Sequence, residues 1–262
     1  MKLWILSDIH TELSRGWDLP PPSEWPDFDV LIMAGDLMPH MERGVDWLRE
    51  RIPDRPVIYI AGNHEAYHCD IDDTREQAKE AAAGTNIHVL ENESVVIDGV
   101  RTLAGTLWTD FQLFDAPEIA MRAAAQFMND YRLIRTDAYS RILRPLDTLA
   151  RHVATRQFIE NGLSQPFSGP TVVVTHHGPY RGALRAGHER DVLSAAYASD
   201  LSPVIKRYQP DVWIFGHTHR SDNMLLGSTR IVSNAKGYGP QVAGGQWENP
   251  AFDPTFTIEI KP

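Results

Sequence analysis

Five short apolar runs, each ending at a small or polar residue, constrain the fold of this chain more than any other feature. Runs this short, rich in Val and Ile and bounded by Gly or polar residues, are typical of buried β-strands rather than helices. Helical patterns lie between several of them, such as Arg43–Arg51 and Asp72–Ala83. This alternation predicts an α/β core with parallel strand pairing. The runs are Leu3–Leu6, Val30–Ala34, Val57–Ala61, Thr171–Val174 and Val212–Phe215.

Further strands are expected with little helix between them, which favours antiparallel or mixed pairing in a second sheet. Residues 106–165 differ, because Pro117–Tyr131 and Leu146–Asn161 have helical periodicity, with Ile119, Ala123 and Phe127 in register. We interpret 106–165 as a helical insertion, or cap, within a single domain spanning 1–262. The further strands are Val95–Ile97, Arg101–Ala104, Met224–Leu226, Arg230–Val232 and Phe256–Ile260.

Charge and composition exclude several classes of partner. The chain has 25 Lys and Arg against 35 Asp and Glu, a formal net charge of −10, so long duplex nucleic acid is a disfavoured partner. No apolar run approaches the roughly 18 residues that span a bilayer, and the N-terminal run is too short for a signal peptide. We therefore expect a cytoplasmic protein without a membrane partner. Cys69 is the only cysteine, which excludes an intramolecular disulfide and a Cys-rich zinc module.

Candidate metal ligands and acid–base groups follow directly after the five predicted strands. Ligands bind at the carboxyl ends of strands in α/β sheets. Residues two apart in an extended segment point to the same side, so Asp8 and His10 can face one pocket. A Gly-His-x-His motif is expected only on the order of 0.03 times by chance in such a chain. The residues are Asp8, His10, Asp36, Asn63, His64, His176, His177, His217 and His219.

The donor set suits two metal ions. Two carboxylates, one amide oxygen and four imidazoles are enough for two ions that share a bridging carboxylate, with positions left for water and substrate. Oxygen mixed with imidazole, without thiolate, favours Mn, Fe or Zn over Mg or Ca.

Taken in order, these motifs resemble the signature of calcineurin-like metallophosphoesterases over residues 3 to about 234. The resemblance implies a four-layer αββα sandwich, in which two mixed sheets face each other with helices outside. The motifs are Asp8-Ile9-His10, Gly35-Asp36, Gly62-Asn63-His64-Glu65, Thr175-His176-His177 and Gly216-His217-Thr218-His219.

The resemblance also implies a role for each residue. His64 would not bind metal but would donate a hydrogen bond to the phosphate or protonate the leaving oxygen. His176 is preferred to His177 as a ligand because it takes the first position after its strand. Asp36 would bridge both metals, the first being held by Asp8, His10 and His219 and the second by Asn63, His176 and His217.

The chain departs from the protein Ser/Thr phosphatase branch after Gly35-Asp36. That branch continues with an Asp that orients the histidine acid and an Arg that binds phosphate, whereas Leu37-Met38-Pro39-His40 stands here. A protein-phosphatase role is therefore disfavoured, and phosphate must be bound by other residues. The candidates are His40, His177, Arg181, Arg185 and His188.

We therefore expect a dinuclear metal-dependent hydrolase acting on a small, soluble phosphate ester, with His64 and Asp36 as its catalytic residues. The two metals would lower the pKa of a bridging water, giving a hydroxide that attacks the phosphorus in line. A diester is favoured because the missing Arg lowers the charge available to a dianionic monoester. The alternatives are a phosphomonoesterase of a small metabolite or nucleotide, an inactive metal-binding scaffold of the same fold, and a nuclease acting on short oligonucleotides.

Overall fold

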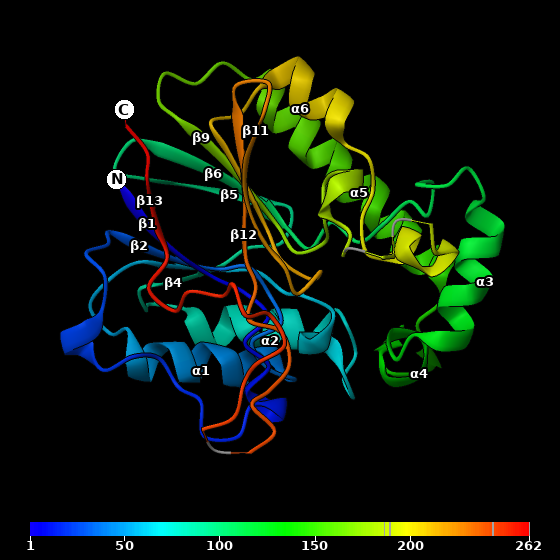
Figure 1. The fold of residues 1–262 in the computed structure, drawn as a ribbon, viewed down its shortest axis with the longest axis horizontal. Coiled ribbons are helices and arrows are strands. Elements are labelled where there is room, and N and C mark those ends of the chain that lie inside the picture. Colours follow the sequence, from blue (N-terminus) through cyan, green and yellow to red (C-terminus); the bar gives the residue numbers. More distant parts are fainter. Residues whose placement is uncertain (186, 189, 243, 262) are drawn as a thin grey trace.

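Two β-sheets lie face to face with helices on both outer sides (Figure 1). The computed structural model describes residues 1–185, 187–188, 190–242 and 244–261. The first sheet has the order β13 (Thr257–Glu259), β1 (Lys2–Leu6), β2 (Val30–Met33), β3 (Val57–Tyr59) and β4 (Ile87–Val89). The second has the order β11 (Ser221–Leu226), β12 (Thr229–Asn234), β10 (Val212–Phe215), β9 (Thr171–Thr175), β6 (Val100–Gly105) and β5 (Glu93–Ile97).

Both sheets are mixed. Strands β1 to β4 pair in parallel, and β13 joins β1 antiparallel. Strands β12, β10, β9 and β6 also pair in parallel, with β11 and β5 antiparallel at the two edges. The predicted α/β sandwich is therefore confirmed, including the antiparallel strands.

Helices cover the outer faces of both sheets. In Figure 1, α1 (Met41–Arg51) and α2 (Asp73–Ala82) lie on one outer side, and α5 (Pro145–Ser164) and α6 (Ser202–Tyr208) on the other. Ile5 and Val174 pack between the sheets, while Trp4 packs toward Val45 and Leu48 of α1. Strands buried on both faces read as continuous apolar runs, which is why the five runs were so clear in the sequence. None of the described helices is both long and apolar enough to cross a bilayer.

The insertion differs from its prediction in two ways. Its first helix, α3 (Pro117–Phe127), ends four residues before Tyr131, and α4 (Asp130–Leu133) and a hairpin of β7 (Arg135–Thr136) and β8 (Arg141–Ile142) follow. The segment is therefore not wholly helical.

The predicted apolar stripe of the first insertion helix was also wrong. Ile119 and Phe127 are 60% and 61% exposed, whereas Ala120 and Ala124 are buried. The two alanines belong to the same buried apolar cluster as Ala195 and Ala196 of the short 3-10 helix Val192–Ala196, which α3 contacts. Helix α6 and strand β4 had no counterpart among the predicted elements.

Candidate metal centre

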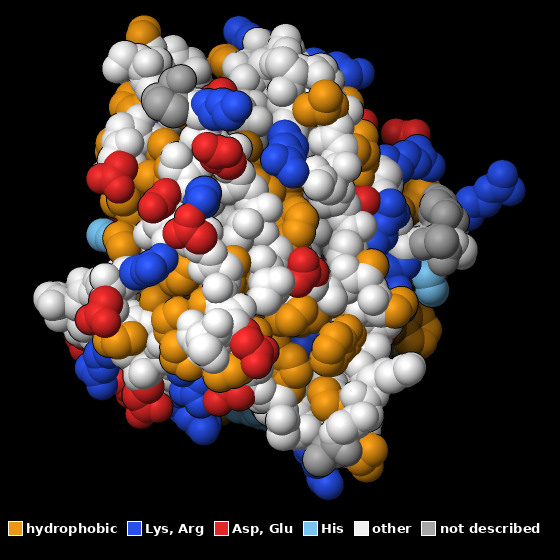
Figure 2. Space-filling view, turned by 60° about the vertical axis from the view of Figure 1, so that its left-hand side comes forward, with side chains coloured by type: hydrophobic (Ala, Val, Ile, Leu, Met, Phe, Trp, Pro, Cys, Tyr) orange, Lys and Arg blue, Asp and Glu red, His pale blue; other side chains and the backbone are white. Residues whose placement is uncertain are grey.

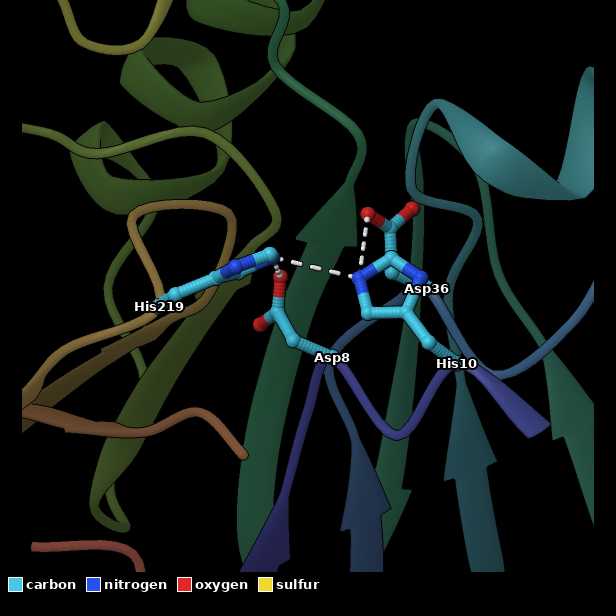
Figure 3. Close-up of side chains that lie close together, drawn as sticks. All are labelled: Asp8, His10, Asp36 and His219. Atoms are coloured by element: carbon cyan, nitrogen blue, oxygen red, sulfur yellow. Dashed lines mark hydrogen bonds and ion pairs between the residues drawn. The ribbon is translucent and has the colours of Figure 1, made fainter. Parts of the chain in front are cut away.

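Loops from both sheets bring the predicted ligands to one place. Asp8 and His10 follow β1 and Asp36 follows β2, while His219 comes from the loop after β10 in the other sheet (Figure 3). Asp8, His10 and Asp36 have φ of 55°, 48° and 57°, and His219 has 48°. Positive φ is uncommon outside glycine and costs energy, and residues held in this way are typical of functional sites.

The first group consists of Asp8, His10, Asp36 and His219. Nε2 of His10 lies 3.1 Å from Nε2 of His219, and Oδ1 of Asp8 lies 3.4 Å from the latter atom. The opposite ring nitrogens are occupied, because Nδ1 of His10 lies 3.2 Å from Glu12 and Nδ1 of His219 lies 2.6 Å from Glu248. Each Nδ1 therefore carries the proton in the neutral ring, and the two facing Nε2 atoms present lone pairs. Lone pairs that converge in this way are suited to a cation.

The second group consists of Asp36, His176 and His217, with Asn63 beside it. Nδ1 of His176 donates to the carbonyl oxygen of Ala34 at 2.9 Å, so in the neutral ring its Nε2 is the acceptor. That Nε2 lies 3.1 Å from Nδ1 of His217 and 3.2 Å from Oδ1 of Asn63. Within the described residues, Nε2 of His217 has no hydrogen-bond partner. This cluster of acceptors also fits a metal ion.

Asp36 joins the two groups. Its Oδ2 lies 3.5 Å from Nε2 of His10 and 3.4 Å from Nε2 of His176. Burial opposes the charged carboxylate, but the neighbouring His176 and His64 outweigh burial and hold the pKa of Asp36 well below its usual range. Burial likewise lowers the pKa of His176, but Asp36 and Asp8 overcome it and raise that pKa to about 10. The centre therefore attracts positive charge, as a site for two cations must.

Three glutamates support the centre, and sequence reasoning assigned a role to none of them. Glu12 and Glu248 fix the ring nitrogens of His10 and His219, and those hydrogen bonds overcome burial and lower the pKa of each glutamate to about 2. Glu65 is buried and accepts hydrogen bonds from the backbone N–H groups of Gly62, Asp36 and Leu37. The Gly-Asn-His-Glu motif could have identified Glu65. Glu248 belongs to none of the sequence motifs.

The insertion contributes a buried carboxylate. Asp130 of α4 accepts hydrogen bonds at 2.8 Å from Nδ2 of Asn63 and from the hydroxyl of Tyr67. Because Nδ2 is held there, the amide oxygen of Asn63 points toward His176. Oδ2 of Asp130 has no partner among the described residues.

Two adjoining cavities open beside the centre. The first, about 220 Å³, is lined by Asn63, His64, His217 and His219, by Phe127–Asp130 of the insertion, and by Tyr238. The second, about 170 Å³, shares four lining residues with the first and is otherwise walled by Leu184, Ser194 and their neighbours. The shared residues are Arg185, Leu193, Tyr197 and Thr218.

The predicted phosphate-binding residues lie in different places. Arg185 lines both cavities and pairs with Glu248, and His188 lines the second cavity. His40 is outside both cavities, with Nδ1 3.2 Å from Sγ of Cys69, and Arg181 stacks over Phe114.

His177 does not reach the cavities either. Its side chain is fully buried, packs against Trp108 and His217, and has Nδ1 3.3 Å from the carbonyl oxygen of Thr106. Burial and the nearby His176 lower the pKa of His177 to about 3, which keeps the ring neutral. His177 therefore packs behind the candidate metal ligands and does not line either cavity.

The chain is similar to several known proteins. A model of the calcineurin-like phosphoesterase family matches residues 1–221, a range that includes all seven predicted ligands. The uncharacterized protein L509 of Acanthamoeba polyphaga mimivirus is 24% identical over 286 residues, covering 98% of this chain and 96% of that protein. The solved phosphopantetheinyl hydrolase of Mycobacterium tuberculosis has a TM-score of 0.65 at 20% identity, over 90% of this chain and 89% of that one. A dimetal phosphatase from Danio rerio has a TM-score of 0.46 at 11% identity, over 88% and 86% of the two chains.

Proposed function

Because the chain belongs to the calcineurin-like phosphoesterase family, whose members depend on two metal ions, we propose that it hydrolyses small phosphodiesters at the centre around Asp36. The observation that carries the proposal is the position of Oδ2 of Asp36, within 3.5 Å of ring nitrogens from both ligand groups. From this position Asp36 would contribute negative charge to the binding of both ions. Asp8, His10 and His219 would hold one ion, Asn63, His176 and His217 the other, and Mn, Fe or Zn suits both donor sets.

Two bound cations would supply an activated water and neutralise charge on the phosphoryl oxygens. The protein supplies the rest of the chemistry. The backbone N–H of His64 donates to Oδ1 of Asp36 at 2.9 Å, which fixes the start of the loop that carries the ring. Burial opposes protonation of His64, but Asp36 and Glu12 outweigh it and raise its pKa. The ring, lining the first cavity, is placed to give a proton to the leaving oxygen.

The charge and shape of the cavities favour a diester. Arg185 is the one Lys or Arg among the described residues lining the first cavity, and Glu248 already pairs with it. A dianionic monoester would therefore find little uncompensated positive charge from the protein. The second cavity, walled by Leu184, Leu193 and Tyr197, gives room for the second ester group of a diester.

A small molecule is also a better substrate than a long nucleic acid. Figure 2 shows one face of the molecule, on which Lys and Arg side chains are interspersed with Asp and Glu. Together with the net charge of −10, this gives no continuous basic surface on that face to release counterions from a duplex.

The test compares kcat/KM of the manganese-loaded protein on bis(p-nitrophenyl) phosphate and on p-nitrophenyl phosphate. We expect the diester to be preferred. A phosphopantetheinyl ester belongs in the panel, since the solved hydrolase of the same fold is named for that group. Preference for the monoester would instead make the protein a phosphomonoesterase.

The variant Asp36→Asn tests the shared carboxylate. We expect it to lose activity and one equivalent of metal, because a neutral amide bridges two cations poorly. Asp46→Asn, which changes a half-exposed carboxylate of α1, is the matched control. Full activity in Asp36→Asn would overturn the two-metal proposal.

A further inference from the structure

One carboxylate oxygen contacts two histidines with different roles. Oε1 of Glu12 lies 3.2 Å from Nδ1 of His10 and 3.0 Å from Nδ1 of His64. The contact to His10 is local, because the left-handed backbone of His10 turns the chain into the 3-10 helix Thr11–Leu13. The contact to His64 spans 52 residues of sequence, from the loop after β1 to the loop after β3.

The other side of each ring faces the centre or the cavity. Nε2 of His10 belongs to the first ligand group, and the side chain of His64 lines the first cavity. The two rings meet edge to face with centroids 4.3 Å apart, and Tyr67 stacks on His64 at 4.1 Å. With Tyr67 on one face and Glu12 on Nδ1, the His64 ring is held in both position and rotation.

We propose that Glu12 is a positioning residue that orients His64 toward the substrate and, through the same oxygen, orients the metal ligand His10. This inference rests on the proposed function for the role of His64. A carboxylate that accepts from Nδ1–H of His64 leaves Nε2 as the nitrogen available to the phosphate ester. Because one oxygen serves both rings, the proton donor is aligned with the first metal position rather than with the second.

A third metal ion among His10, Glu12 and His64 is the competing interpretation, since these three groups also lie close together. It would require His10 to bind metal through both nitrogens and hence to lose both ring protons. A hydrogen bond needs only the neutral ring, with one N–H directed at Glu12.

The first experiment measures kcat/KM on aryl phosphodiesters whose leaving groups differ in basicity, at saturating manganese. We expect Glu12→Ala to lose about 10–100-fold on the poorest leaving groups and much less on the best, as general-acid catalysis requires. Glu12→Gln, which keeps an acceptor oxygen, should recover part of the loss. The double variant Glu12→Ala/His64→Ala should depend on leaving-group basicity no more steeply than His64→Ala, because any further loss through His10 is the same for every leaving group. A steeper dependence in the double variant, or an equal loss on all leaving groups in Glu12→Ala, would overturn the proposal.

The second experiment does not depend on turnover. Ring ¹⁵N shifts of the zinc-loaded protein, recorded at a pH high enough for the His64 ring to be neutral, should show His64 protonated at Nδ1 in the wild type, with the tautomers mixed in Glu12→Ala. Glu24→Ala, which removes an exposed glutamate from another 3-10 helix, is the control and should leave the shifts unchanged. Unchanged His64 shifts in Glu12→Ala would refute positioning by Glu12. Absence of hydrolysis by the wild type, with the tautomer result intact, would instead refute the proposed function.

Discussion

At the scale of single residues, the glycines of the motifs are explained by how closely the backbone approaches the carboxylates. A Cβ added to Gly62 would lie 2.1 Å from Oδ1 of Asp36, and one added to Gly216 would lie 2.5 Å from Oδ2 of Asp8. Neither distance is compatible with a real side chain. The glycine before Asn63 and the glycine before His217 therefore permit the metal centre to close, which is their physical role in the sequence pattern.

Gly62→Ala tests this close approach. The new methyl group must displace Asp36, so we expect the affinity for metal to fall by about 10–100-fold, the range seen when support around a ligand is disturbed. Metal titration by calorimetry measures the change. Gly84→Ala is the control, because it adds a methyl group in open space at a strained φ of +74° and should lower stability without changing metal affinity. Wild-type affinity in Gly62→Ala would contradict the steric argument.

His152 of α5 gives the chain a pH-dependent contribution to stability outside the metal centre. Its side chain is buried, with Nδ1 3.4 Å from the carbonyl oxygen of Trp108, and burial outweighs the nearby Asp110 to lower its pKa. The unfolded chain therefore takes up a proton near pH 6.5 that the folded chain resists, so stability falls as the pH drops through that value. We expect His152→Gln to lose less unfolding free energy than the wild type between pH 7.5 and 5.5, measured by urea unfolding. An identical pH dependence in both proteins would contradict this.

At the scale of elements, the strands and the residues at their ends could be predicted because both leave local signals. Strands covered on both faces give apolar runs, and their ends carry Gly, Asp or His where the sheets expose their carboxyl edges. The supporting groups leave no such signal. Glu248 and Asp130 contact the centre through residues distant in sequence. The buried face of α3 was predicted wrongly because small alanines, rather than Ile119 and Phe127, are buried in the core.

The short helix α4 is expected to support metal binding as well as to line the cavity. Asp130→Ala would free the Asn63 amide, which now donates to Asp130 at 2.8 Å, and should weaken the second metal position by about 10–100-fold. Glu118→Gln changes an exposed acid in α3 of the same insertion and is the control. If Asp130→Ala bound both metals as tightly as Glu118→Gln does, Asp130 would have no role in metal binding. The insertion would then act only by lining the cavity.

At the scale of the whole molecule, the metal centre lies across the junction of the two sheets. Asp8, Asp36 and Asn63 follow strands of the first sheet, whereas His176 and His217 follow strands of the second. Each ligand group draws on both sheets. Metal binding at these groups would therefore be linked to the packing of one sheet against the other, in addition to the apolar layer between them.

Removing the metals should consequently lower the stability of the entire fold. A ligand that binds only the native state adds about 2.7 kcal/mol at a free concentration 100 times its Kd, which for a chain of this size corresponds to about 5–10 °C in Tm per site. We expect chelation to lower Tm by at least this amount and added manganese to restore it, as followed by calorimetry. Asp36→Asn, which is expected to bind one metal fewer, should show a smaller response to either treatment. A wild-type Tm that does not respond to chelation, in protein shown to have lost its metal, would mean that the sheets pack independently of the centre. The link between the two sheets would then be the apolar layer alone.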